Sequence, residues 1–138
     1  MALTIICVRG ASSTGKSSTI REFTEKHLKY RKDRGDVLGI FHMSYMHYVV
    51  GVSGFGDTPE LVRGGLEFLT RYRGLKVIVI ACHLEGSSTF REVERFAKKA
   101  KVKPRFIDTE WIASRAGRRA AIRANVRKIR KAMPVRPY

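Results

Sequence analysis

Residues 10–17 have the sequence Gly-Ala-Ser-Ser-Thr-Gly-Lys-Ser, which follows the phosphate-loop pattern Gly-x-x-x-x-Gly-Lys-[Ser/Thr]. Residues 3–8 before it, Leu-Thr-Ile-Ile-Cys-Val, are apolar and rich in β-branched side chains, so they predict a strand. Residues 16–29 after it suit a helix, with Ile20, Phe23 and Leu28 at helical spacing. A strand, a glycine loop and a helix in this order form the context in which the pattern binds phosphate.

The residue types of the loop explain this chemistry. Glycines adopt backbone angles that let successive N–H groups converge, and the start of the helix adds free N–H donors and partial positive charge. Lys16 is expected to contact the β and γ phosphates, and the Ser17 hydroxyl to bind Mg²⁺. The predicted phosphate-binding residues are Gly10, Ala11, Ser12, Ser13, Thr14, Gly15, Lys16 and Ser17. The alternative is a Gly/Ser-rich turn that merely contains a lysine.

With these residues the chain resembles the P-loop NTPase superfamily, and its small kinase-like members most closely. The resemblance is specific over residues 3–30 and looser beyond them. It implies that the matched positions bind a nucleoside triphosphate, ATP or GTP, together with Mg²⁺. It leaves open which phosphate is moved and to what acceptor.

The rest of the chain alternates predicted strands and helices. Strands are expected at residues 37–43, 47–52, 76–82 and 104–107, and helices at 59–72, 89–100 and 110–133. The short gap at Ser44, Tyr45 and Met46 predicts an antiparallel hairpin. We therefore expect one domain spanning residues 1–138, a three-layer α/β sandwich with a mainly parallel five-stranded sheet. The loops at 10–17, 54–58 and 83–88 should meet at the carboxyl ends of the strands.

A carboxylate is expected near the metal, and Asp57 is the first candidate because it follows the apolar strand at 47–52. A competing interpretation is that Asp57 or Thr58 only caps the next helix. Glu85 is the second candidate, although its loop also has the composition of a helix start. His83, a single histidine after the strand at 76–82, is interpreted as structural.

Phosphoryl transfer also needs positive charge near the transferred group. Resemblance to nucleotide kinases implies a catalytic role for Arg91, with Arg95 four residues later, although no lid-sized insertion is present. The second source consists of Arg115, Arg118 and Arg119. Trp111 falls where such kinases contact the base, but a core position is the interpretation we favour.

Charge is the second unusual feature of the chain. Twenty-eight Lys and Arg against 12 Asp and Glu give a net charge of +16, and the segment from Arg115 to Arg136 contains nine basic residues and no acid. A polyanionic partner is one inference, and a solvated basic helix is the other. The stripe Ile122, Val126, Ile129 and Met133 should pack on the domain and leave the arginines outside.

The remaining composition favours a cytoplasmic location without a membrane partner. The chain has no apolar run long enough to span a bilayer and no signal-peptide pattern. Cys7 and Cys82 lie within predicted strands and are interpreted as reduced core residues.

Three functions remain open on the sequence. The first is a small kinase-like phosphotransferase that passes the γ-phosphoryl group of ATP–Mg²⁺ to a nucleotide or nucleoside. The second is a nucleic-acid-associated NTP-binding protein or NTPase that uses the basic C-terminal helix. The third is a P-loop protein that binds nucleotide without turnover. Lys16, Asp57 and Arg91 are the predicted catalytic residues, and Ser17 and Asp57 the predicted metal ligands.

Overall fold

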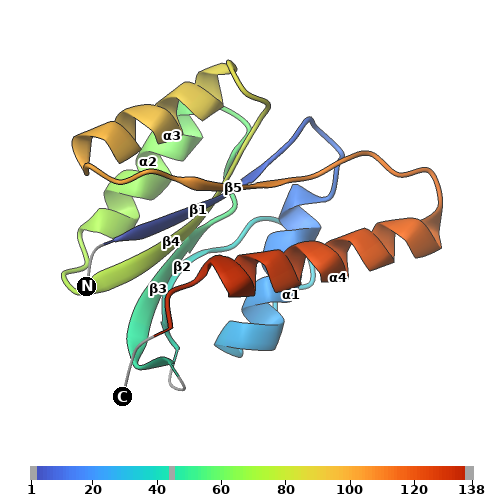
Figure 1. Cartoon of the computed structure of the whole chain (residues 1–138), viewed down its shortest axis with the longest axis horizontal. Helices are drawn as coiled ribbons and strands as arrows, with labels where there is room; N and C mark the ends of the chain where they lie inside the picture. Colours follow the sequence, from blue (N-terminus) through green and yellow to red (C-terminus); the bar gives the residue numbers. More distant parts are fainter. Residues whose placement is uncertain (1–2, 44–45, 136–138) are drawn as a thin grey trace.

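The computed structural model describes residues 3–43 and 46–135 (Figure 1). The elements within these residues follow one another as β1 (Thr4–Arg9), α1 (Lys16–Leu28), β2 (Leu38–Met43), β3 (Tyr48–Ser53), α2 (Pro59–Thr70), β4 (Leu75–Cys82), α3 (Ser88–Lys99), β5 (Arg105–Asp108) and α4 (Arg115–Ala132). The chain therefore has the α/β alternation that the sequence predicts.

The sheet has five strands in the order β2-β3-β4-β1-β5. Strand β1 is parallel to its neighbours β4 and β5, and β3 is parallel to β4. Strand β2 is antiparallel to β3, which confirms the predicted hairpin. Ser44 and Tyr45, which were expected to form the hairpin turn with Met46, lie outside the described residues.

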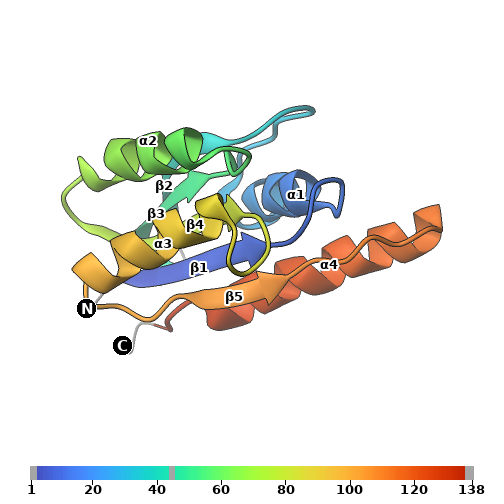
Figure 2. The ribbon, with the colours of Figure 1, turned by 90° about the horizontal axis from the view of Figure 1, so that it is seen from above.

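Helices cover both faces of the sheet (Figure 2). Helices α1 and α4 pack together on one face, and α2 and α3 pack together on the other. The two cores follow from the alternation of the central strands, because Ile6 and Val8 of β1 lie in one core while Ile5 and Cys7 lie in the other. Strand β4 is nearly continuous in apolar residues because both of its faces are covered.

Both cysteines are buried, as predicted, on neighbouring strands. The Sγ atoms of Cys7 and Cys82 are 2.8 Å apart, and both thiols are free. Burial raises the pKa of the Cys7 thiol, and the neighbouring Cys82 raises it further. A buried thiol of this kind behaves as a core residue rather than as a nucleophile.

The final helix begins later than predicted, at Arg115 instead of residue 110. The Ser114 hydroxyl caps it by accepting a hydrogen bond from the Gly117 N–H at 3.0 Å. The expected apolar stripe is confirmed, because Val126, Ile129 and Met133 are buried and Ile122 is partly buried against the same core.

Trp111 precedes this helix in an irregular segment and is 67% exposed, so the core position we favoured for it is wrong. In both ribbon views the N-terminal turns of α4 extend beyond the end of the sheet (Figures 1 and 2).

The carboxyl ends of the parallel strands form one edge of the molecule. The loops after β1, β3, β4 and β5 all leave the sheet there. Since β2 runs the opposite way, its start lies at the same edge, with Leu38 paired to Ser53 at the end of β3. The residues just before β2 therefore join this edge, which the sequence analysis did not take into account.

Candidate phosphate-binding site

The loop of residues 10–15 is held tightly against the sheet edge. The Gly10 N–H donates to the carbonyl of Cys82 at 3.1 Å, and the Thr14 hydroxyl is hydrogen-bonded to that of Thr109 at 2.6 Å. A Cβ atom at Gly10 would collide with both of these hydroxyls. Glycine is therefore required at the first position of the pattern because of a close approach, not only because of flexibility.

Two residues of the loop have left-handed backbone conformations, Ser13 with φ 63° and Gly15 with φ 89°. Such a conformation is uncommon for serine and costs on the order of 1 kcal/mol, so the surrounding structure must impose it. Left-handed residues within a tight turn bring successive N–H groups to one side, which creates an anion-binding concavity.

Helix α1 starts directly after this loop. Its N-cap is Gly15, no side chain accepts a hydrogen bond from its first N–H groups, and its first turn contains no acid. The other three caps, at α2, α3 and α4, each use a Thr or Ser hydroxyl. Among the four helices described, α1 alone begins without a side-chain acceptor, so its positive N-terminal end is available to an anion.

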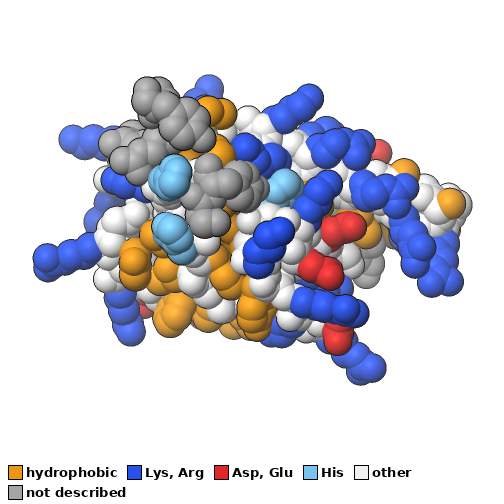
Figure 3. All heavy atoms as spheres, turned by 90° about the horizontal axis from the view of Figure 1, so that it is seen from below, with side chains coloured by type: hydrophobic (Ala, Val, Ile, Leu, Met, Phe, Trp, Pro, Cys, Tyr) orange, Lys and Arg blue, Asp and Glu red, His pale blue; other side chains and the backbone are white. Residues whose placement is uncertain are grey.

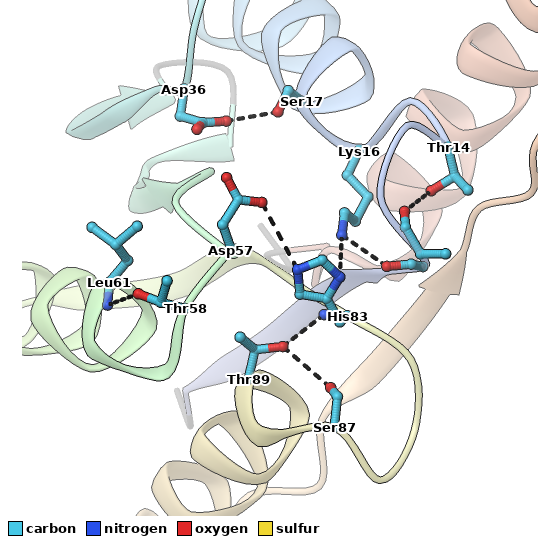
Figure 4. Close-up of polar contacts among 12 residues, drawn as sticks. Thr14, Lys16, Ser17, Asp36, Asp57, Thr58, Leu61, His83, Ser87 and Thr89 are labelled. Atoms are coloured by element: carbon cyan, nitrogen blue, oxygen red, sulfur yellow. Dashed lines mark hydrogen bonds and ion pairs between the residues drawn. The ribbon is translucent and has the colours of Figure 1, made fainter.

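Lys16 is folded over the loop and is only 8% exposed. Its ammonium donates to the carbonyl of Gly10 at 2.7 Å and lies 3.4 Å from Nδ1 of His83 (Figure 4). Burial lowers the pKa of Lys16, and the negative charge of Asp57 partly opposes that shift. A buried cation without a carboxylate in contact gains from an incoming phosphate, which would supply the missing charge partner.

Ser17 is hydrogen-bonded to a carboxylate that the sequence analysis missed. Its hydroxyl donates to Oδ1 of Asp36 at 2.7 Å (Figure 4). Asp36 lies just before β2, and the Lys32 ammonium donates to its backbone carbonyl at 2.7 Å. The hydroxyl and the carboxylate are hard oxygen donors of the type that Mg²⁺ takes in proteins.

Asp57 lies on the same edge but does not contact Ser17. The cap of α2 is Thr58, whose hydroxyl accepts from the Leu61 N–H at 3.1 Å, so Asp57 is not that cap. The Asp57 side chain is 73% exposed, and its Oδ1 lies 3.8 Å from Nε2 of His83 (Figure 4). His83 is fixed in turn, because its backbone N–H donates to the hydroxyl of Thr89 at 2.8 Å.

These residues surround the first of two cavities beside the loop, which we call the polar cavity. It has a volume of about 550 Å³ and contains no hydrophobic side chain in its lining. Its lining residues are Ser12, Ser13, Gly15, Lys16, Ser17, Ser18, Asp57 and His83. The structure thus brings Lys16, Ser17 and Asp57 together, as the sequence predicts.

The second cavity lies between the loop and α4, and we call it the helix cavity. Its volume is about 400 Å³. Its lining residues are Ser13, Thr14, Gly15, Ser18, Glu110, Ile112, Arg115, Arg118, Arg119, Ala121, Ile122 and Asn125. The second set of predicted arginines, Arg115, Arg118 and Arg119, is therefore next to the phosphate loop.

The structure does not bring Arg91 into either cavity. Arg91 is exposed on α3 and lines neither of them, and Arg95 forms an ion pair with Glu92 at 2.8 Å instead. Glu85 is exposed in the loop after β4, where Ser87 caps α3.

The ends of β1 and β5 are joined beside the loop by an ion pair. Arg9 donates to Asp108 through Nε at 2.7 Å, and its guanidinium lies 4.2 Å from the ring centroid of Phe106. This hydrogen bond is the main reason that the pKa of Asp108 is lowered. The contact fixes the last residues before the loop against the last residues before the helix cavity.

Comparison with protein-family models, with curated proteins and with solved structures finds no match for this chain. In the part of the chain that the structure describes, no helix is both long and apolar enough to cross a membrane. The same residues contain no cluster of three or more His, Cys, Asp or Glu side chains that would enclose a metal by themselves. Mg²⁺ bound to a triphosphate needs no such cluster, because phosphates and water supply most of its ligands.

Proposed function

We propose that this chain binds a nucleoside triphosphate with Mg²⁺ in the loop of residues 10–17 and acts as a small phosphotransferase. The observation that carries the proposal is the buried ammonium of Lys16, which lies over a loop with two left-handed residues at an uncapped helix start. This combination leaves positive charge and N–H donors without an anionic partner at the edge of the sheet.

In this proposal, Ser17 and Asp36 hold the metal. Their oxygen atoms lie 2.7 Å apart and face the same space as Lys16 (Figure 4). When bound, the metal neutralises charge on the β and γ phosphates. Lys16 holds its proton and supplies further positive charge, while Ser17 and Asp36 orient the phosphates relative to the loop.

The polar cavity is the proposed place of the acceptor, a nucleoside or a nucleotide. Asp57 lies there with an exposed carboxylate, next to His83. A carboxylate in hydrogen-bond reach of an acceptor hydroxyl can take its proton during transfer. Arg115 and Arg119, which line the adjoining helix cavity, replace Arg91 as the candidate source of additional positive charge.

The direct test is calorimetric titration of the protein with ATP and GTP, each with and without Mg²⁺. It is followed by a γ-phosphoryl transfer assay against a panel of nucleosides and nucleotides. Binding that strengthens with Mg²⁺, together with a phosphorylated acceptor, is the expected result. Absence of any triphosphate binding would refute the proposal, whereas hydrolysis without transfer would reduce it to an NTPase.

The exposed arginines of α4 favour a second candidate, the nucleic-acid-associated NTP-binding protein. Arg115, Arg119, Arg123 and Arg127 are exposed on a helix of 18 residues that contains no acid. Lys and Arg side chains spread over the face seen from below, with a group at the end where α4 begins (Figure 3). A polyanion with regularly spaced phosphates suits such a surface.

This candidate predicts that binding of an unmodified oligonucleotide weakens by about 0.9 log units per log unit of salt for each phosphate contacted. Fluorescence anisotropy with single- and double-stranded oligonucleotides at two salt concentrations measures it. The double substitution Arg123→Gln and Arg127→Gln should lower the salt dependence, and Arg71→Gln on α2 is the matched control. No binding at low salt would remove the second candidate.

A further inference from the structure

The helix cavity contains a buried amide that lacks a partner. Asn125 is 7% exposed, lines the cavity, and forms no side-chain hydrogen bond to any of the described residues. A buried amide without a hydrogen bond costs on the order of 1–3 kcal/mol. Its position is therefore better explained by a ligand that occupies the cavity than by packing.

The walls around Asn125 differ from those of the polar cavity. Ile112 and Ile122 supply apolar surface, and Ala121 leaves space between them and the arginines. The guanidinium of Arg118 is held by the carbonyl groups of Ile112 and Ala113 at 3.0 and 2.7 Å. Apolar walls with a few fixed polar groups are typical of sites that bind a small organic ligand.

The two cavities share Ser13, Gly15 and Ser18, so a ligand with its phosphates on the loop can extend into either one. The polar cavity offers only Ser, Gly, Lys, Asp and His residues, which suit phosphates and a hydroxyl. A nucleobase is a flat, largely apolar ring with donors and acceptors on its edge. Only the helix cavity combines apolar walls with an amide that can both donate and accept.

We propose that the helix cavity binds the base of the nucleotide and that Asn125 forms hydrogen bonds to the edge of that base. This inference rests on the proposed function, since it concerns the same nucleotide. It assigns α4 a role in base recognition, separate from the contacts that its exposed arginines make.

The test compares two neighbouring alanines of α4 that differ in position. Ala121→Leu fills the cavity, whereas Ala120→Leu adds the same side chain at an exposed position outside it. Calorimetry measures affinity for ATP, GTP, CTP and UTP, and for inorganic tripolyphosphate, which has no base. Circular dichroism and thermal unfolding show whether each variant is folded.

We expect Ala121→Leu to weaken nucleotide binding by about tenfold or more and to leave tripolyphosphate binding unchanged, because only the base is displaced. Ala120→Leu should alter neither. Asn125→Ala should weaken nucleotide binding by about 5- to 10-fold and reduce the differences among the four nucleotides. This second variant adds no volume, so it tests the same site if Ala121→Leu does not fold.

Unchanged nucleotide affinity in both folded variants would place the base elsewhere and overturn the inference. An equal loss of nucleotide and tripolyphosphate would overturn it too, because the substitutions would then act on the phosphate loop. Failure of the proposed function is distinguishable, since the unsubstituted protein would bind neither nucleotide nor tripolyphosphate.

Discussion

The polar cavity and the helix cavity lie on two sides of one loop and share three residues, yet their chemistry differs. The polar cavity is built by strand ends and by the start of α1, and it contains Lys16, Asp57 and His83. The helix cavity gains Ile112, Ile122 and Asn125 from the segment after β5 and from α4. The sheet edge therefore supplies charge for phosphate chemistry, while the last helix supplies the surface that distinguishes one ligand from another.

The largest effect is expected from Lys16→Ala, which acts on the charge that both cavities depend on. Loss of one charge-assisted contact to phosphate should weaken binding of nucleotide and of tripolyphosphate alike, by about 10- to 100-fold. Calorimetry on the folded variant measures this, and Lys26→Ala, an exposed lysine of α1, is the matched control. Unchanged affinity would mean that the phosphates do not lie on this loop.

The next effect concerns the two carboxylates near the polar cavity. Asp36→Asn should reduce the strengthening of nucleotide binding by Mg²⁺ by about tenfold, because Asp36 contacts Ser17 directly. Asp57→Asn should leave that strengthening nearly unchanged and lower phosphoryl transfer, since Asp57 lies at the proposed acceptor position. Titration with Mn²⁺, followed by electron paramagnetic resonance, reports the metal independently of activity. If Asp57→Asn alone weakened metal binding, the assignment would return to Asp57.

A smaller effect is expected at the start of α4, where Ser114 caps the helix that walls the helix cavity. Ser114→Ala should lower the free energy of unfolding by about 1 kcal/mol, because the Gly117 N–H loses its acceptor. Chemical denaturation measures it, and Ser88→Ala, an exposed serine at the first position of α3, is the control. Tripolyphosphate affinity should be unaffected, which separates the two cavities; a loss of it would show that they are coupled.

The smallest effect is a dependence on pH. The pKa of Lys16 is lowered by burial in the free protein, and a bound phosphate would raise it, so the complex holds the proton more tightly than the free protein does. Binding should therefore weaken as pH rises through the lowered pKa of the free protein. Tripolyphosphate titrations between about pH 7 and pH 10 test this on a group that ordinarily titrates near 10.4.

Lys16→Arg provides the control for this dependence, because arginine keeps its charge over the whole range. A folded Lys16→Arg variant with an identical pH profile would show that another group is responsible.

Local patterns in the sequence predicted most of the fold. The run at residues 76–82 is so rich in β-branched residues that its burial on both faces followed directly, and β4 has that environment. The start of the last helix was placed too early because the apolar stripe begins only at Ile122, and Ser114 was not weighed as a cap. Trp111 was misplaced for a similar reason, since its side chain belongs to no periodic pattern that would show its exposure.

The candidate site was predictable where it depends on the loop and not where it depends on pairing between distant segments. Lys16 and Ser17 belong to one motif, whereas Asp36 reaches Ser17 only because β2 is antiparallel and begins at the carboxyl edge. The predicted hairpin contained that information, and tracing its register would have found Asp36. Asn125 had no signal of its own, because its importance depends on a cavity between segments far apart in the sequence.

The position of β1 between β4 and β5 has a consequence for synthesis of the chain. The Gly10 N–H is held by the carbonyl of Cys82, and the Arg9 carbonyl accepts from the N–H of Thr109 at 2.8 Å. A ribosome releases the phosphate loop first and its two supports much later, so the nascent loop has no fixed shape until residue 109 has emerged. Nucleotide therefore cannot assist the early stages of folding, and the first motif to be translated is among the last to become functional.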